Sequence, residues 1–323
     1  MNHRYIPKHL NMFLGYSTNI YNRLHGSSGG VGTGIFQYLL DSRQVDAVIG
    51  VGFDKKERTK AVYQLVEHSS RVSELAGSKY VYMPLPPLLE LVNQHRDKTL
   101  AVVVEPCFVK PIRKLAPHCK FIMSFFCGYN RTSDATDYLI RQSKIDKSQI
   151  QAIEYRGGPY PGGFTVHTHS GTSKSFKKEH YELVDLLFLK DSCHRCSLFI
   201  SDRADIVLGD AWIKKAKNMT LILINTNEGD HALKTMHENS LVSLYDIEEK
   251  DVLKMHAHNL KYKNEGHSFV MKAIVSLFNN KIARKIAPFR LLGFASKIRR
   301  AIMVGIDLPL KPVQKYGVRS FVG

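Results

Sequence analysis

The chain has 323 residues, of which 44% are hydrophobic, enough to bury one large core or two ordinary ones. Its formal net charge is +17 and its pI is near 9.6, so an acidic partner is expected, such as nucleic acid, an anionic membrane or a phosphorylated ligand. Basic residues are spread along the chain apart from a cluster after residue 281, and no known nucleic-acid-binding motif occurs. We therefore expect no nucleic acid as partner.

Two further features bear on location. The five cysteines are an odd number, and residues 1–13 contain no apolar signal core, which favours a reducing cytoplasmic compartment where thiols are free to bind metal. No apolar run reaches the roughly 20 residues that a spanning helix needs, so an integral membrane protein is not expected.

A glycine-rich segment opens the patterned part of the sequence. Residues 1–24 show no clear period and predict an irregular lead-in, whereas residues 26–34 are small and precede Ile35, Tyr38 and Leu39 at helical spacing. This predicts a loop that leads into a helix, whose free amide groups favour a phosphate. The alternative is a turn whose glycines only permit close packing. No strand is expected before the loop and G-x-G-x-x-G is absent, so the Rossmann fingerprint is not met.

Short apolar runs then alternate with helical patterns, which predicts an α/β fold. A turn at Gly77–Tyr80 places a lysine and two small residues where they could meet a phosphate or a ring edge. The alternative is a solvated Lys79 beside a packed Tyr80. Strands are expected at residues 46–53, 61–70, 100–104, 119–126 and 221–225, and helices at 86–95, around 112–115, after 132 and from about 229.

The cysteines are the strongest candidates for a site. Cys107 and Cys127 each follow a predicted strand, and ligands of open α/β sheets lie beyond the carboxyl ends of strands. Cys119 begins its strand and is expected at the opposite edge. Cys193 and Cys196 form a C-x-x-C pair, which suits half of a zinc site, a dithiol redox pair or part of an iron–sulfur cradle.

The second half of the chain carries three weaker signals. Glycines and prolines at residues 156–161 predict a hinge between two subdomains. Residues 164–178 alternate like a hairpin, with His167 and His169 on one face, either binding metal or an anion or simply solvated. Residues 267–304 alternate apolar and basic residues at helical spacing, which fits an anionic membrane surface, a docked partner or a helix packed on the core.

Six segments taken in order resemble one known family. They are SSGGVGTGIFQYLL, AGSKYVYMPL, EPCFVKPIRKL, FFCGYN, YRGGPYPGGF and CHRCSLFISDRADIVLGDAW. In series they are similar to the coenzyme F420-reducing hydrogenase/dehydrogenase beta-subunit family, from about residue 25 to about residue 230.

The resemblance implies an oxidoreductase that passes electrons between a flavin, FAD or FMN, and a 4Fe-4S cluster. Its cluster thiolates would be Cys107, Cys127, Cys193 and Cys196, with Asp202, Asp205, Gly209, Asp210 and Trp212 shaping the surrounding turn. Lys79 and His167 are the candidate catalytic side chains. The residues that would contact the flavin are Ser27, Ser28, Gly29, Gly30, Thr33, Gly77, Ser78, Lys79 and Tyr80.

Two departures from the family pattern limit the resemblance. The chain shows no ferredoxin-like segment with further C-x-x-C repeats, so a second cluster would sit on a partner. Phe108 follows Cys107 where the family usually has glutamine, so we expect the substrate contact at this loop, and with it the deazaflavin specificity, to differ from the family pattern.

We therefore expect an α/β fold with mixed sheets and flanking helices, two subdomains around a flavin and iron–sulfur site, and a helical tail. The expected parts are a lead-in at 1–24, a flavin-binding part at 25–150, an iron–sulfur part at 151–265 and a basic tail at 266–323. The expected partners are an electron-transfer protein, a small-molecule substrate and, through residues 267–304, an anionic membrane. The alternatives are a closed, non-catalytic metal site and a peripheral-membrane enzyme of a polysaccharide-biosynthesis pathway.

Overall fold

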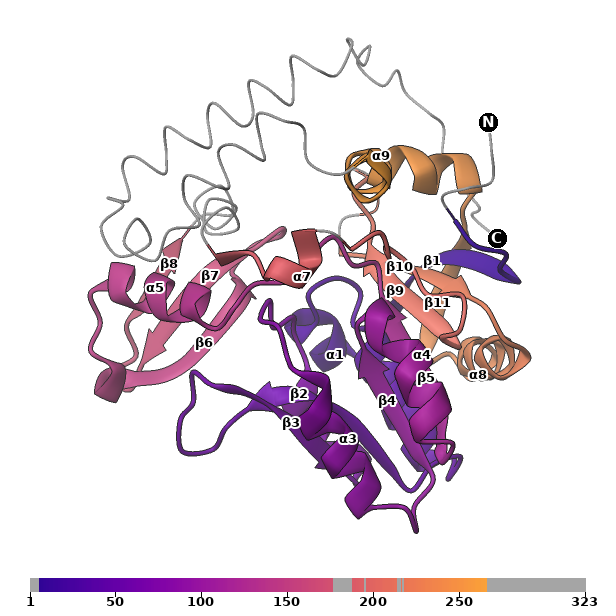
Figure 1. Cartoon of the computed structure of the whole chain (residues 1–323), viewed down its shortest axis with the longest axis horizontal. Coiled ribbons are helices and arrows are strands. Elements are labelled where there is room, and N and C mark those ends of the chain that lie inside the picture. The colour runs from indigo at the N-terminus through magenta and orange to yellow at the C-terminus, as the bar shows by residue number, and fades with distance from the viewer. Residues whose placement is uncertain (1–5, 177–187, 195, 214–215, 217, 266–323) are drawn as a thin grey trace.

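The computed structural model describes residues 6–176, 188–194, 196–213, 216 and 218–265 (Figure 1). The predicted basic tail at 267–304 lies outside this part of the chain. Within the described residues no helix is long and apolar enough to cross a membrane.

The described strands form one large mixed sheet and one small antiparallel sheet, which confirms the α/β prediction. The large sheet has the order β11-β1-β10-β9-β5-β4-β2-β3, and the small one β6-β7-β8. The large sheet consists of β1 (Asn11–Ser17), β2 (Ala47–Phe53), β3 (Ala61–Val66), β4 (Leu100–Val104), β5 (Cys119–Phe125), β9 (Ile206–Asp210), β10 (Thr220–Ile224) and β11 (Val242–Asp246), and the small sheet of β6 (Ile150–Gly157), β7 (Gly163–Thr168) and β8 (Ser173–Phe176).

Alternate residues of the large sheet point into two cores on its opposite faces, which is the pattern of a sheet covered by helices on both sides. One core contains Leu100 and Val102 of β4 with α3 (Leu85–Gln94), α4 (Pro106–Leu115) and α9 (Glu249–Glu265). The other contains Ala101 with α2 (Val31–Asp41), the short helix η1 (Ser69–Leu75) and α8 (Asn227–Glu238). A third core lies between α5 (Asp134–Ser143) and the small sheet (Figure 1).

The predicted irregular lead-in is wrong for residues 11–17, which form β1, and a strand therefore does precede the glycine-rich loop, with α1 (Ile20–His25) between them. β1 pairs with β10 on one side and β11 on the other. Because β1 is covered on both faces, it lacks the two-residue period of a half-exposed strand. Gly15 is needed in its middle, because a Cβ there would lie 2.9 Å from the Ser243 carbonyl oxygen.

The predicted hinge at 156–161 is a hairpin turn within the small sheet. β6 and β7 pair from Ile150↔Thr168 to Gly157↔Gly163, and the Gly162 amide donates to the Pro159 carbonyl oxygen at 2.7 Å. Glycine and proline mark both hinges and tight turns, so composition alone did not separate the two. The predicted hairpin at 164–178 is confirmed by β7 and β8.

Candidate functional site

Two parallel strands deliver two of the candidate thiols to one edge of the sheet. β4 and β5 pair in parallel up to Val104↔Ser124, and Cys107 and Cys127 lie just beyond their carboxyl ends, as predicted. Cys119 is buried at the first position of β5, at the amino-terminal end. The expectation that Cys119 lies at the opposite edge is therefore confirmed.

The C-x-x-C pair is fastened to the segment that follows Cys127. The short helix α7 (Asp191–His194) carries Cys193, and Lys190 before it donates its amide to the Asn130 carbonyl oxygen at 3.0 Å. The Cys127 amide in turn donates to the Phe199 carbonyl oxygen at 2.9 Å, just after Cys196. Backbone hydrogen bonds on both sides therefore hold the later loop against the end of β5.

The electrostatics place the four thiols in one neighbourhood. Burial, together with the charges of Glu105, Cys196 and Cys193, raises the pKa of Cys107 to about 12. Burial also raises the pKa of Cys127, with Glu105, Cys193 and Cys107 acting in the same direction. Burial likewise raises the pKa of Cys193, to which Cys196 and Glu105 add. The two sheet thiols and the C-x-x-C pair are thus within electrostatic range of one another.

Two charged side chains that the sequence did not mark complete this cysteine group. Glu105 directly precedes α4 without a side-chain capping hydrogen bond, burial raises its pKa, and its Oε1 accepts from Nδ2 of Asn130 at 3.0 Å. Lys263 of α9 is buried, and its positive charge opposes the rise in the pKa of Cys127 and Cys193. Neither has a local sequence signal of its own, and Lys263 comes from a helix more than sixty residues beyond the last of these cysteines.

No three described His, Cys, Asp or Glu side chains converge closely enough to hold a single metal ion. A closed zinc site would need its sulfurs about 2.3 Å from one ion.

A second group of candidate residues lies where the glycine-rich loop meets the segment 77–80. The Ser78 amide donates to Oγ of Ser27 at 2.7 Å, which joins the two predicted flavin segments directly. Oγ of Ser28 lies 3.0 Å from Oγ1 of Thr220. The glycine-rich loop and the segment 77–80, about fifty residues apart in the sequence, therefore lie side by side and form one surface.

The glycines of this loop are required for packing. A Cβ on Gly29 would lie 2.4 Å from the Gly15 carbonyl oxygen, and one on Gly30 only 2.2 Å from that of Asn22. Gly30 also has φ = 73° and begins α2 with no side chain capping the first turn, on which Thr33 lies. The packing alternative thus accounts for the two glycines, while the uncapped amide groups of the helix start still suit an anion.

The side chains of Lys79 and Tyr80 are both at least half-buried. Nζ of Lys79 donates to the carbonyl oxygens of Leu75 and Ala76 at 2.9 and 2.6 Å, and burial lowers the pKa of this lysine to about 7. The ring of Tyr80 packs edge-on to Tyr155. Tyr80 is therefore packed, as one alternative held, whereas Lys79 is held by the end of η1 and is not simply solvated.

Arg156 ties the small sheet to the site. Its Nη1 lies 2.6 Å from Oδ2 of Asp210 at the end of β9, with both side chains largely buried, and its Nε donates to the Pro161 carbonyl oxygen at 2.9 Å. The guanidinium carbon lies 5.8 Å from the ring centre of Trp212. Arg156 and Asp210 are thus a buried ion pair at the same edge of the sheet.

The remaining predicted residues lie elsewhere. The two ring nitrogens of His167 contact Glu154 and Ser173 of the small sheet at 2.9 and 2.8 Å. Nothing in the described chain brings this ring to the thiols or to Lys79, and its catalytic role stays a prediction. Asp205 accepts from the Ile122 amide at 2.6 Å and pairs with Arg113. It therefore lies just before the amino-terminal end of β9, beside the middle of β5, which corrects its expected place in the turn around the cysteines.

The carboxyl ends of β4, β5 and β9 thus lie near four thiols and the uncapped start of α2, at the edge where the oxidoreductases of the α/β class bind their ligands. Two family models described as "Coenzyme F420 hydrogenase/dehydrogenase, beta subunit" match the sequence, the N-terminal one over residues 12–90 and the C-terminal one over residues 97–250. The chain belongs to the coenzyme F420 hydrogenase/dehydrogenase beta subunit family. The match extends beyond residues 25–230, which carry the resemblance in the sequence, because β1 belongs to it.

Individual relatives agree with this placement. The chain is 24% identical over 256 residues to the coenzyme F420 hydrogenase subunit beta of Methanococcus voltae, covering 73% of this chain and 86% of the relative. It is 24% identical to the F420-dependent formate dehydrogenase subunit beta of Methanocaldococcus jannaschii, covering 69% and 59%. A chain of the F420-reducing [NiFe] hydrogenase complex from Methanosarcina barkeri has the same fold, with a TM-score of 0.66, 16% identity and coverage of 82% and 93%.

Proposed function

We propose that the protein is an electron-transfer subunit that binds a flavin and a 4Fe-4S cluster and exchanges electrons with a small acceptor and with a partner protein. The observation that carries this proposal is the cysteine group, in which Cys107 and Cys127 from two strand ends stand within electrostatic range of Cys193 and Cys196. Soft anionic sulfur is the ligand that such clusters require.

A cluster and a closed zinc site differ in the spacing of their sulfurs. In a 4Fe-4S cluster each thiolate binds a different iron, so the sulfurs stand farther apart than around one ion. The family to which the chain belongs favours the cluster, and the neighbouring thiol charges that act on Cys107, Cys127 and Cys193 are compatible with four sulfurs that share it. Lys263 would partly compensate the negative charge that four thiolates bring into a buried site.

The loops around Ser27 and Ser78 fit the phosphate end of a flavin nucleotide. The first amide groups of α2 have no side-chain cap, and an anion is favoured at such a helix start by both hydrogen bonding and the helix dipole. The flavin would supply both one-electron and hydride chemistry. The chain would orient the flavin, and Lys79, which two carbonyl oxygens hold in place and whose pKa burial lowers to about 7, would in its protonated form offer a positive charge to the reduced anion.

The names of the relatives suggest the reaction partners. Relatives described as coenzyme F420 hydrogenase and F420-dependent formate dehydrogenase beta subunits favour a deazaflavin as acceptor. The solved structure that shares this fold is part of a hydrogenase complex, which favours a partner protein that carries electrons to this chain. Phe108 stands where the family usually has glutamine, so the acceptor contact at that loop would differ from the family pattern.

Quantifying iron, acid-labile sulfide and flavin in anaerobically purified protein tests the proposal. Bound iron and sulfide with a broad visible band are expected, and Cys107→Ala, Cys127→Ala and Cys196→Ala should each lose most of the iron. Cys119→Ala is the matched control, because this buried thiol lies at the other edge and should leave the iron content unchanged. A colourless protein that contains one zinc would overturn the assignment, and the extracted flavin distinguishes FAD from FMN.

A further inference from the structure

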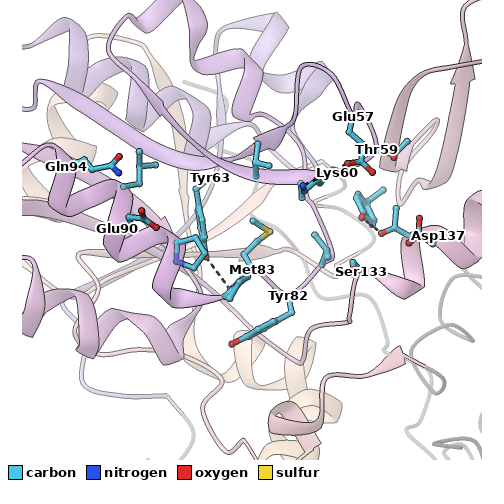
Figure 2. Close-up of a pocket in the computed structure, with 18 residues that line it drawn as sticks. Glu57, Thr59, Lys60, Tyr63, Tyr82, Met83, Glu90, Gln94, Ser133 and Asp137 are labelled. Carbon is cyan, nitrogen blue, oxygen red and sulfur yellow. Dashed lines mark hydrogen bonds and ion pairs between the residues drawn. The ribbon is translucent and has the colours of Figure 1, made fainter. Parts of the chain in front are cut away.

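A groove of about 750 Å³ lies between the edge strand β3, helix α3 and the start of α5 (Figure 2). Its volume suits a ring-sized organic ligand. Tyr63 and Met83 form its middle, where the Tyr63 hydroxyl donates to the Met83 carbonyl oxygen at 3.3 Å. The apolar part of its lining consists of Ala61, Val62, Val81, Pro84, Pro87 and Leu91.

The groove adjoins the cysteine group through Tyr82. The ring of Tyr82 lies 6.2 Å from that of Phe108, which follows Cys107 directly in the chain. Nζ of Lys190 lies 5.0 Å from the centre of the same ring, and the Lys190 carbonyl oxygen accepts from the Cys193 amide at 2.8 Å. One aromatic side chain therefore separates a ligand in the groove from the elements that carry two of the four thiols.

The charge of the groove contrasts with that of the chain. Figure 2 shows Glu90 and Gln94 at one end and Glu57 and Asp137 at the other. Lys60 is the one basic residue of the lining and lies 4.0 Å from Glu57, while Lys147 pairs with Asp137 at 2.8 Å. Glu90 is exposed and has no ion pair among the described residues. A polyanion would meet this unpaired carboxylate, whereas a cation would neutralise it.

We propose that this groove binds a planar aromatic molecule that carries positive charge, and that it is an electron-exchange site separate from the flavin loops. The electron-exchange part rests on the function proposed above, whereas the binding part does not. The ring would stack among Tyr63, Tyr82 and Met83, and its charge would lie toward Glu90. The ring would gain one electron, which the cluster that Cys107, Cys127, Cys193 and Cys196 would hold would supply, with no bond made or broken.

The binding part is tested with two flat probes of opposite charge, methyl viologen and anthraquinone-2,6-disulfonate, by titration calorimetry on the full chain in low salt. We expect the viologen to bind and the disulfonate to bind at least tenfold more weakly. Glu90→Lys should weaken viologen binding at least tenfold, and Glu90→Gln about threefold. Glu238→Lys is the matched control, because Glu238 is another exposed helical glutamate, at the end of α8, and should leave binding unchanged.

A steric variant separates a true groove ligand from general surface attraction. Ser133 lines the groove, is exposed and makes no capping hydrogen bond to α5, so Ser133→Phe should fill the space without unfolding the protein, as far-ultraviolet circular dichroism would verify. Loss of viologen binding in this variant supports the groove. Equal binding by wild type, Glu90→Lys and Ser133→Phe overturns it.

The redox part has its own readout. The rate of viologen reduction by the reduced protein should fall in Glu90→Lys in proportion to binding, while the iron content stays unchanged. Binding without any reduction would remove the electron-exchange role and leave the binding site. A protein without iron that still binds viologen in the groove would show that the proposed cluster fails while the groove holds.

Discussion

Nη1 of Arg156 and Oδ2 of Asp210 lie 2.6 Å apart, so one buried ion pair joins the end of β6 in the small sheet to the end of β9 in the large one. The pair is enclosed by Tyr80, Tyr160 and Trp212. Because both side chains are largely buried, neither charge can be left alone without cost. The contact therefore fixes how the two sheets meet beside the candidate flavin surface.

Removing the cation of this pair should destabilise the protein strongly. Arg156→Met leaves the Asp210 carboxylate buried without its partner, and we expect a loss of about 3 kcal/mol in the free energy of unfolding. Urea denaturation at neutral pH measures it. The double variant Arg156→Met/Asp210→Leu should recover much of the loss, because no charge is then left unpaired. If the single and double variants unfold alike, the pair contributes little.

The stability of the protein should fall in mild acid because of His256. The centre of its ring lies 5.1 Å from that of Phe126 and 5.4 Å from that of Phe199. Burial lowers the pKa of His256 to about 4. The unfolded chain, with a histidine pKa of about 6.5, therefore binds more protons between pH 6.5 and 4. The contribution of His256 to the free energy of unfolding is fully retained above pH 6.5 and is lost as the pH falls. At pH 5 this loss is about 2 kcal/mol.

Comparing wild type with His256→Phe by urea unfolding at pH 7.5 and pH 5.0 isolates this contribution. Phenylalanine keeps the stacking and cannot take up a proton, so the variant should lose about 2 kcal/mol less than wild type between the two pH values. An equal loss in both proteins would show that the ring is protonated in the folded state without cost.

The contacts of Asp205 predict a structural role. Its Oδ2 accepts from the Ile122 amide and from Nη2 of Arg113, both at 2.6 Å, and its Oδ1 accepts from the Thr226 hydroxyl at 2.8 Å. Asp205→Ala should lower the free energy of unfolding by about 3 kcal/mol, because a buried amide and a cation lose their acceptor. Iron content per folded protein should not change, since the length of β9 separates this residue from the carboxyl edge where the thiols lie.

The sequence was sufficient to predict the strands on which the site depends. Continuous apolar runs identified β2, β4 and β10, and the position of Cys107 and Cys127 after two such runs placed both at one edge. This worked because parallel strands end on the same side of a sheet whatever their neighbours are. The placement of Cys107 and Cys127 at one edge was therefore readable from local patterns and one rule of topology, whereas only the family resemblance grouped them with Cys193 and Cys196.

The parts that local patterns could not supply depend on distant segments. β1 pairs with β10 and β11, which lie more than two hundred positions away, and its two faces belong to different cores, so it shows no two-residue period. Lys263 and Glu105 reach the thiols only because α9 and α4 pack beside the same end of the sheet. The groove beside Tyr82 forms only where the start of α5 lies beside β3 and α3. Asp205 was expected beside the cysteines because they are close to it in the chain. In the structure Asp205 lies at the start of β9, so the length of that strand separates it from the carboxyl edge.

The contact between Ser27 and Ser78 gives a sharp test of the flavin surface. The Ser27 hydroxyl accepts from the Ser78 amide at 2.7 Å, so Ser27→Ala removes the bond that holds the segment 77–80 against the glycine-rich loop. A neutral hydrogen bond of this kind contributes about 1 kcal/mol, and we expect flavin affinity to fall about fivefold while the protein stays folded. Ser42→Ala is the control and should bind flavin normally. It removes the hydrogen bond from the Ser42 hydroxyl to the Tyr38 carbonyl oxygen at the far end of α2, the helix that follows the glycine-rich loop. Fluorescence titration with FAD and FMN measures both variants, and equal affinity in Ser27→Ala and wild type would place the flavin away from these two loops.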